Sequence, residues 1–227
     1  MVAPAVVVDA VRKEFGRIVA VDEVTFDVHP GEFVGLVGPN GAGKSTTIKM
    51  LTGQLIPTRG RLEVVGVEVA ADPNRARAFI GYVPEEPHLY EYLSAREMLE
   101  FVVSVRGGGD VDAALAVAGL GEDSHRLIRE YSQGMRRKTA LACAMVARPP
   151  VLVLDEALNG LDPPSAARVV AALRQACADG TAVLLSTHVL DTLERVADRV
   201  VMISEGRVKA DVPAAELDRV RGLFGEG

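Results

Sequence analysis

The sequence has 227 residues, a length that suits one large α/β domain with a sizeable hydrophobic core. Apolar residues make up 48 %, which excludes an intrinsically disordered chain. The net charge of −6 argues against a nucleic-acid partner, because binding a phosphate backbone needs a basic surface. The sequence contains no targeting segment and no apolar run long enough to span a membrane, so we expect a cytoplasmic protein whose Cys143 and Cys177 are reduced core residues.

The first part of the chain has the character of an antiparallel sheet that leads into a second sheet. The links between its early strands are too short for crossover helices, which favours antiparallel pairing. Strands are expected at residues 5–11, 19–21, 24–28, 32–37, 61–65 and 80–83. A turn is expected at 13–17, and helices are expected at 46–52 and 72–77.

The pattern changes to helices between residues 85 and 148. Ser94 and Glu97 form a capping box at the start of one helix, and three glycines at 107–109 end it. Asp110 caps a second helix, and a third is expected at 134–147, before two prolines. This segment is interpreted as a helical subdomain inserted into the α/β part of the chain.

Strands and helices alternate again after residue 148. The apolar run at 151–154 is typical of a parallel strand that is buried on both faces. The remaining elements are expected at 163–178, 181–185, 189–197, 200–203, 207–209 and 214–224. The predicted fold class is α/β, with a mostly parallel sheet, an N-terminal antiparallel β subdomain and an inserted α-helical subdomain. We expect one domain over residues 1–227, with 1–84 and 149–227 forming the core.

Residues 38–46 match the phosphate-loop pattern G-x-x-x-x-G-K-[ST] at every fixed position. They are Gly38, Pro39, Asn40, Gly41, Ala42, Gly43, Lys44, Ser45 and Thr46. Glycines let successive N–H groups face one concavity that holds phosphate oxygens, and Lys44 adds positive charge for the β- and γ-phosphates. An ordinary glycine-rich turn is the alternative, but a strand before the loop and a helix after it are the context that this motif requires.

An acidic pair, Asp155 and Glu156, follows the apolar strand at 151–154. Carboxylates at the carboxyl end of a buried parallel strand lie where open α/β sheets bind ligands. Beside a phosphate loop, Asp155 and the Ser45 hydroxyl are candidate ligands of Mg²⁺. Glu156 is then a candidate catalytic residue that orients or polarises the attacking water. Taken without the phosphate loop, the pair would be interpreted as solvated acids at a strand end.

The segment YSQGMRRK at residues 131–138 precedes the acidic pair. Ser132 and Gly134 open a helix, so their N–H groups and the Ser132 hydroxyl form a candidate anion site. The segment resembles the signature usually written L-S-G-G-Q. Phosphate loop, helical insertion, signature, acidic pair and the later His188 occur in the order found in ATP-binding domains of ABC transporters, and this resemblance covers nearly the whole chain.

The resemblance implies roles for residues that chemistry alone leaves open. Ser132, Gln133, Gly134 and Met135 are expected to contact the γ-phosphate of ATP bound to a second copy of the domain. The segment Asn159, Gly160, Leu161 and Asp162 matches the part that meets that partner subunit. His188 is expected to contact the γ-phosphate, as a third catalytic candidate with Lys44 and Glu156. Phe15 is expected to stack on adenine, although an aromatic residue near the N-terminus is equally compatible with the core.

The chain departs from the family pattern at several positions. Gln133 and Met135 replace the second glycine and the glutamine of the signature, and Ala157 stands where proline is usual. Glu85 stands where the family has a glutamine that contacts Mg²⁺ and moves with the membrane partner. A carboxylate is the stronger ligand for a hard cation, so Glu85 is a third metal candidate, with a surface acid as the alternative. The charges of Arg136, Arg137 and Lys138 either face an anion or form a solvated basic surface.

The resemblance implies hydrolysis of ATP with Mg²⁺ between two identical domains that close head to tail. A separate membrane-spanning permease would form the pathway, docking near residues 85–99 on Pro87, Leu89, Tyr90 and Tyr92. The bacterial ABC-2-type exporter ATPases are the most similar group, which places the protein at the inner face of the cell membrane. The alternatives are a soluble ABC-type ATPase with a non-membrane partner, and a regulatory module that binds nucleotide without turnover.

Overall fold

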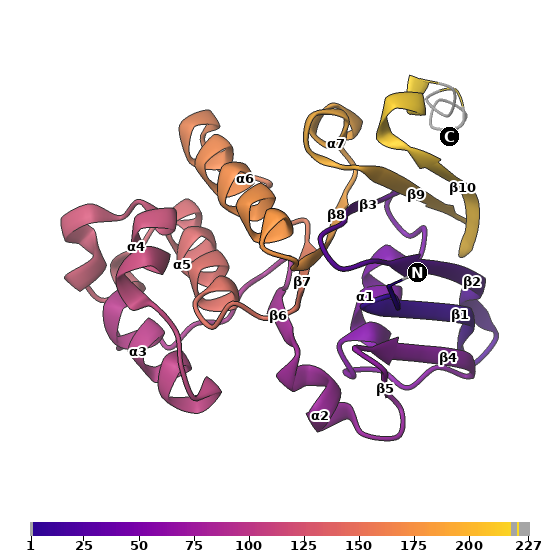
Figure 1. Cartoon of the computed structure of the whole chain (residues 1–227), viewed down its shortest axis with the longest axis horizontal. Coiled ribbons are helices and arrows are strands. Elements are labelled where there is room, and N and C mark those ends of the chain that lie inside the picture. The colour runs from indigo at the N-terminus through magenta and orange to yellow at the C-terminus, as the bar shows by residue number, and fades with distance from the viewer. Residues whose placement is uncertain (1, 219–221, 223–227) are drawn as a thin grey trace.

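The computed structural model describes residues 2–218 and 222, and these form two sheets with helices around them (Figure 1). The smaller sheet has the strand order β2-β1-β4-β5, and all of its pairs are antiparallel. Its strands are β1 (Val6–Phe15), β2 (Ile18–Val28), β4 (Arg59–Val64) and β5 (Val67–Glu68). The antiparallel character of the first part of the chain is as predicted.

Two of the predicted boundaries in this sheet are wrong. The predicted turn at 13–17 is only two residues wide, and the strands predicted at 19–21 and 24–28 form the single strand β2. The physical reason is a set of register shifts along the β1–β2 pair, accompanied by positive φ angles of 46° at Ala10 and 55° at Glu23. Such bulges interrupt the alternation of apolar residues without ending the strand pairing.

The larger sheet has the order β10-β9-β3-β8-β7-β6 and is parallel except for the hairpin of β9 and β10. Its strands are β3 (Phe33–Val37), β6 (Ile80–Val83), β7 (Val151–Asp155), β8 (Ala182–Thr187), β9 (Arg199–Ser204) and β10 (Arg207–Pro213). Every residue of β3, β7 and β8 is buried. Since these three neighbours run in the same direction, their carboxyl ends meet at one edge of the sheet.

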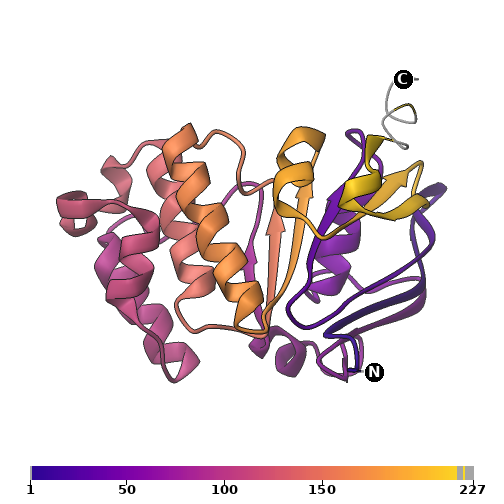
Figure 2. The ribbon, with the colours of Figure 1, turned by 45° about the horizontal axis from the view of Figure 1, so that its top comes forward.

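Three of the helices are gathered at the β6 end of the larger sheet, and the other helices lie along it (Figures 1 and 2). Helices α3 (Ala95–Arg106), α4 (Val111–Ala118) and α5 (Gln133–Met145) pack together around Leu99, Leu115 and Ile128. The others are α1 (Lys44–Leu51), α2 (Pro73–Ala78), α6 (Pro163–Ala178) and α7 (Leu190–Val196). Short 3₁₀ turns occupy Gly121–His125, Ile128–Glu130 and Ala214–Glu216.

The predicted helix ends agree with the structure where a cap is present. The capping box of Ser94 and Glu97 starts α3, Gly107 ends it with a φ of 80°, and Asp110 caps α4. The helix predicted at 46–52 begins earlier, at Lys44, and the turns at 121–130 are not predicted. Of the helix predicted at 214–224, only a 3₁₀ turn is seen at its start, and residues 219–221, 223 and 224 lie outside the described residues.

Both cysteines are free, and neither is placed for chemistry. Cys177, near the end of α6, is buried in a cluster that includes Leu193 of α7, and Cys143 is half-buried among the helices of the insertion. Burial raises the pKa of the Cys143 thiol to about 12 and that of Cys177 to about 11. Thiols that hold their protons so strongly are poor nucleophiles, which agrees with their predicted role as core residues.

Candidate active site

The phosphate loop leaves the carboxyl end of β3 in a conformation that requires its glycines. A Cβ atom at Gly38 would lie 2.0 Å from the carbonyl oxygen of Ile203, and one at Gly43, whose φ is 107°, would lie 2.7 Å from that of Ala20. The N–H of Gly206 donates to the carbonyl of Ala42 at 3.0 Å and fixes the loop from outside. The loop lines a cavity of about 320 Å³ together with Ala20, Glu85 and Glu156.

Lys44 lies beneath this loop with only 6 % of its side chain exposed. Its Nζ donates to the carbonyl oxygens of Gly38 at 2.7 Å and Pro39 at 3.1 Å, and lies 4.0 Å from Glu156 Oε1. Burial lowers the pKa of Lys44, while the negative charges of Glu156, Asp155 and Glu85 oppose that shift. The ammonium group is therefore held by neutral carbonyls in a weakly solvated place, where phosphate oxygens are stronger partners.

Asp155 ends β7 beside the first residues of α1. Its Oδ1 accepts from the Ser45 hydroxyl at 3.3 Å and from the Ser186 hydroxyl at 2.5 Å. Sequence analysis missed Ser186. The signal that points to it is register, because Ser186 pairs directly with Asp155 where β8 lies next to β7.

Glu156 is held from several sides just beyond the end of β7. Its N–H donates to the carbonyl of Ser186 at 3.2 Å and to the Ser186 hydroxyl at 3.0 Å, at a left-handed φ of 51°. Its Oε2 accepts from the Asn159 side-chain amide at 2.7 Å and lies 3.1 Å from His188 Nδ1. The carboxylate is 8 % exposed, whereas the His188 ring is 54 % exposed. The adjacent pair Asp155 and Glu156 thus comes together with Lys44 and His188, which lie far from it in the sequence.

The signature segment lies elsewhere in the chain's structure. Ser132 caps α5 by accepting from the N–H of Met135 at 3.3 Å, as predicted for the start of this helix. Among the residues that the structure describes around the cavity, none belongs to 131–135. Figures 1 and 2 show α5 in the group of insertion helices and α1 on the far side of the sheet. One copy of the chain therefore does not bring its own signature to its own phosphate loop.

The three charges after the signature are not a freely solvated surface. Arg136 pairs with Glu91 at 2.8 Å. Arg137 donates to the backbone carbonyls of Glu85 and Asn159, and Lys138 helps to lower the pKa of Asp162, after the larger effect of hydrogen bonds from Ser165. All three side chains are half-buried, and two of them are engaged by groups of the same chain.

Comparisons with known proteins decide the family. The model of the family described as "ABC transporter" matches residues 21–159. The daunorubicin resistance ATP-binding protein DrrA3 of Streptomyces coeruleorubidus is 36 % identical over 98 % of this chain and 72 % of its own length. The Nod factor export ATP-binding protein I of Paraburkholderia xenovorans is 37 % identical over 91 % of this chain and 70 % of its own. The chain belongs to the ABC transporter family.

Solved structures agree with this assignment. The structure of the ATP-binding subunit of an ABC transporter superposes with a TM-score of 0.89 at 34 % identity, over 98 % of this chain and 95 % of that one. A dimeric ATP-binding cassette bound to ADP and Pi shares the fold, with a TM-score of 0.85 at 24 % identity over 92 % of this chain and 98 % of that one. The predicted family and fold class are confirmed, and the chain is an ABC-type ATPase. No helix in the described part of the chain has the length and apolarity needed to cross a membrane.

Phe15 is not a core residue of this ABC cassette, so that alternative is wrong. It lies at the end of β1 with 47 % of its surface exposed, and the Nζ of Lys13 lies 5.1 Å from the centre of its ring. An exposed ring can stack on a base, but Phe15 is not among the residues that line the cavity at the phosphate loop. Its contact with adenine stays a prediction.

The residues near the cavity fit a magnesium ion that arrives with a nucleotide. The Ser45 hydroxyl and Asp155 share a hydrogen bond at 3.3 Å, and Glu85 lines the same cavity. All three offer the hard oxygen atoms that Mg²⁺ prefers. The described ranges contain no cluster of three histidine, cysteine or acidic side chains suited to a metal by themselves. Mg²⁺ commonly takes one or two carboxylates and completes its shell with phosphates and water.

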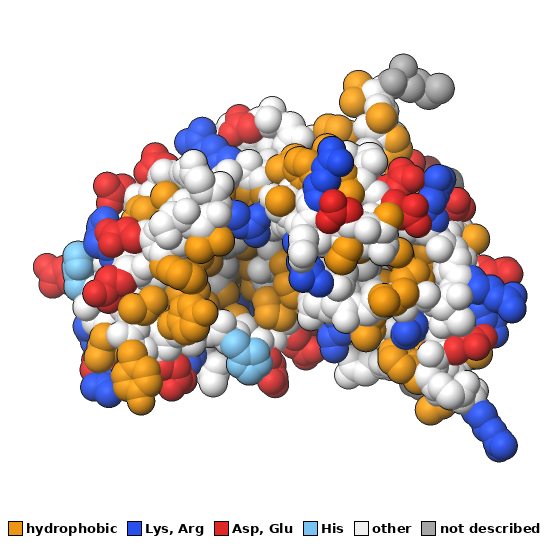
Figure 3. Space-filling model, turned by 90° about the horizontal axis from the view of Figure 1, so that it is seen from below, with side chains coloured by type: hydrophobic (Ala, Val, Ile, Leu, Met, Phe, Trp, Pro, Cys, Tyr) orange, Lys and Arg blue, Asp and Glu red, His pale blue; other side chains and the backbone are white. Residues whose placement is uncertain are grey.

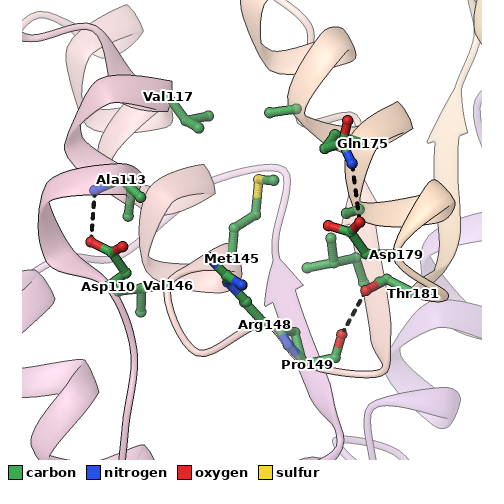
Figure 4. A pocket seen from close by; sticks show the side chains of 14 residues that line it. Asp110, Ala113, Val117, Met145, Val146, Arg148, Pro149, Gln175, Asp179 and Thr181 are labelled. Atoms are coloured by element: carbon green, nitrogen blue, oxygen red, sulfur yellow. Dashed lines mark hydrogen bonds between the residues drawn. The ribbon is translucent and has the colours of Figure 1, made fainter.

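A second cavity, of about 630 Å³, lies between α4, the end of α5 and the end of α6 (Figure 4). Figure 4 shows Met145 and Arg148 between α4 and α6, with Val117 on one side and Gln175 on the other. Two of the acids labelled there already form hydrogen bonds within the chain: Asp110 accepts from the N–H of Ala113, and Asp179 accepts from the side chain of Gln175. None of the predicted site residues lines this cavity.

Proposed function

We propose that this ABC-type ATPase powers transport, in the direction of export, through a separate membrane-spanning subunit. The names of similar proteins support export, because they refer to daunorubicin resistance, bacitracin transport and Nod factor export. The protein would then lie at the inner face of the cell membrane, bound to that subunit. We further propose that residues 85–148 act as one helical subdomain within the single domain of residues 1–227.

The observation that carries the ATPase half of the proposal is the position of Glu156 beside Lys44. The phosphate-loop amides and Lys44 would hold the β- and γ-phosphates, because they surround one cavity and carry the positive charge. Ser45 and Asp155, with Glu85, would hold Mg²⁺, which supplies positive charge against the phosphates. Phosphoryl transfer depends mainly on such positioning and charge stabilisation.

Glu156 would act on the attacking water. Its carboxylate is nearly buried, its Oε2 is held by Asn159, and its Oε1 faces Lys44. A carboxylate fixed in this way can orient a water molecule and accept its proton. His188, which touches Oε2 and is half exposed, would contact the γ-phosphate next to it.

The second half of each site would come from another copy of the chain. Ser132, Gln133, Gly134 and Met135 are exposed or half-buried and lie away from the chain's own cavity. We infer that two copies close head to tail on two ATP molecules, with 159–162 at the contact. In this arrangement, the γ-phosphate bound to one copy would be the anion that the start of α5 contacts in the other copy.

The membrane subunit would dock on the insertion. Exposed aromatic side chains gather there: Tyr90 is 59 % exposed, Tyr92 is 77 % exposed and Phe101 is 44 % exposed. Tyr90 and Phe101 pack edge to face with their centres 5.6 Å apart. Figure 3 shows hydrophobic side chains at this end of the molecule beside a hollow. Apolar patches of this kind mark interaction surfaces.

Glu156→Gln tests the proposed chemistry. The amide keeps the shape of the side chain but accepts protons poorly, so we expect ATP turnover to fall about 100-fold or more, while ATP binding and an ATP-dependent dimer persist. Phosphate release and size-exclusion chromatography with MgATP measure the two effects. Glu86→Gln, a nearby exposed acid outside the cavity, is the control. If the Glu156 variant hydrolyses ATP at the wild-type rate, Glu156 is not the residue that acts on the attacking water.

A further inference from the structure

Arg137, near the start of α5, joins two loops of the candidate active site. Its Nη2 donates to the backbone carbonyl of Glu85 at 2.8 Å, and its Nη1 donates to the backbone carbonyl of Asn159. Glu85 lines the nucleotide cavity, and Asn159 holds Glu156. One guanidinium group therefore connects a wall of the cavity to the loop that supports the candidate catalytic carboxylate.

The neighbouring glycine leaves room for this contact. Gly160 has a φ of +72°, and the atom that an added Cβ would meet is Arg137 Nη1, at 3.3 Å. Within the loop, the N–H of Asn159 bonds to the carbonyl of Glu156 at 3.1 Å, and that of Leu161 bonds to Leu158 at 3.4 Å, while Leu158 and Leu161 pack against the core. In the described part of the chain, Arg137 is the side chain that ties this loop to another element through the Asn159 carbonyl.

We propose that Arg137 is a positioning residue for ATP hydrolysis. It fixes the backbone of Asn159, so that the Asn159 side-chain amide holds Glu156 Oε2 at 2.7 Å, and it couples this loop to the segment of Glu85. The guanidinium suits this task because its planar fork can donate to two carbonyls at once, which a lysine ammonium on a flexible stem does poorly. The inference rests on the proposed role of Glu156 and adds a residue that acts through it.

The test compares Arg137→Gln and Arg137→Lys in the full chain with MgATP. We expect kcat to fall roughly tenfold for both, with KM and nucleotide affinity within about twofold, because a small misplacement of a catalytic group reduces turnover and leaves ground-state binding intact. Arg106→Gln is the matched control. Arg106 also donates to backbone carbonyls, those of Ala78 at 2.9 Å and Ile80 at 2.7 Å, but it touches neither loop. Its kcat should stay within twofold of wild type.

A double-mutant cycle with Asn159→Ala separates positioning from general stabilisation. If Arg137 acts through Asn159, Arg137→Gln causes little further loss of kcat when Asn159 is already alanine. Additive losses, or a wild-type kcat in Arg137→Gln, overturn the inference.

Hydrogen exchange provides a readout without turnover. Faster exchange at 156–162 and 84–86 in Arg137→Gln, with unchanged exchange at 38–46, is expected, and unchanged exchange in both loops overturns the inference. Failure of the proposed function would give a different result, because Glu156→Gln would then hydrolyse ATP at the wild-type rate, whatever residue stands at position 137.

Discussion

Glu156 lies at the meeting point of most of the site's contacts. Its main chain is bound by Ser186, its carboxylate by Asn159 and His188, and its charge faces Lys44. A left-handed φ of 51° at a residue other than glycine is an uncommon conformation that needs such support. These partners come from the loop of Glu156 itself, from the end of β8 and the residue after it, and from the start of α1. The geometry of the catalytic candidate therefore depends on several segments at once.

Glu85 adds a negative charge where the family's pattern has a neutral amide. It lines the cavity and is among the acids that oppose the lowering of the Lys44 pKa. Glu85→Gln should therefore raise the Mg²⁺ concentration needed for half-maximal ATPase activity about fivefold, because one hard anionic ligand is lost. A Mg²⁺ titration of phosphate release at fixed ATP measures this effect.

The matched control for that prediction is Glu86→Gln, which removes the same charge one residue further from the cavity. Both acids are exposed, so non-specific effects of surface charge are equal in the two variants. Equal Mg²⁺ dependence in wild type and Glu85→Gln would mean that Glu85 is a surface acid and not a ligand of Mg²⁺.

At the scale of elements, caps decide where the insertion helices begin. The Glu97 carboxylate accepts from the N–H and the hydroxyl of Ser94 at 2.8 Å each, and the Ser94 hydroxyl accepts from the Glu97 N–H at 3.2 Å. This reciprocal pattern starts α3 where the sequence predicts it. The hydrogen bond from the Ser94 backbone, and then that from its side chain, lower the pKa of Glu97.

The capping box predicts a pH dependence of folding stability. Because the folded-state pKa of Glu97 is below its unfolded value of about 4.3, its contribution is complete above that pH and is lost as the pH falls through the folded-state pKa. Wild type should be more stable than Glu97→Gln at pH 7, and the difference should disappear in acid. Urea unfolding of both proteins between pH 7 and pH 3 measures this, with Glu100→Gln on the same helix as control. A constant difference at all pH values contradicts the prediction.

At the scale of the whole molecule, each chain carries two candidate half-sites at different places. The phosphate loop and Glu156 line one cavity, with Asp155 bonded to Ser45 beside it, and the signature lies at the start of α5 on another part of the surface. Two copies related by a two-fold axis can bring each half-site to the other copy's complementary half. Two incomplete halves on one chain therefore favour a dimer as the active unit.

Mixing two inactive variants tests this arrangement. Lys44→Ala disables the phosphate-loop half, and Gly134→Asp places a negative charge in the signature half. A side chain at Gly134 meets nothing closer than the Gly160 carbonyl oxygen at 3.7 Å, so the fold should tolerate it. Each variant alone should be inactive, whereas a mixture should recover about a quarter of the wild-type rate per chain, since random pairing restores one intact site in half of the dimers.

The control mixture combines Lys44→Ala with Glu156→Gln. Both changes disable the same half-site, so no pairing of these chains restores an intact site and no activity should return. Recovery in the control, or its absence in the test mixture while both variants still dimerise, would contradict the head-to-tail arrangement.

Local patterns were sufficient to predict the phosphate loop, the strand before Asp155, the caps of α3 and α4 and the full extent of α6. They succeed because a cap, a glycine turn or an apolar run depends on residues within a few positions of one another. The bulged pair of β1 and β2 escaped prediction, because a bulge keeps the strand pairing while it breaks the alternation of apolar residues.

The candidate site also has some features that local patterns predict and others that they do not. From the sequence alone, Lys44, Ser45, Asp155 and Glu156 could be identified as candidates for the chemistry, because each belongs to a short motif. Only the tertiary structure revealed Ser186 on Asp155 and Arg137 between the carbonyls of Glu85 and Asn159. These contacts join residues 22 to 52 positions apart, so strand register and helix placement decide them and no local pattern records them.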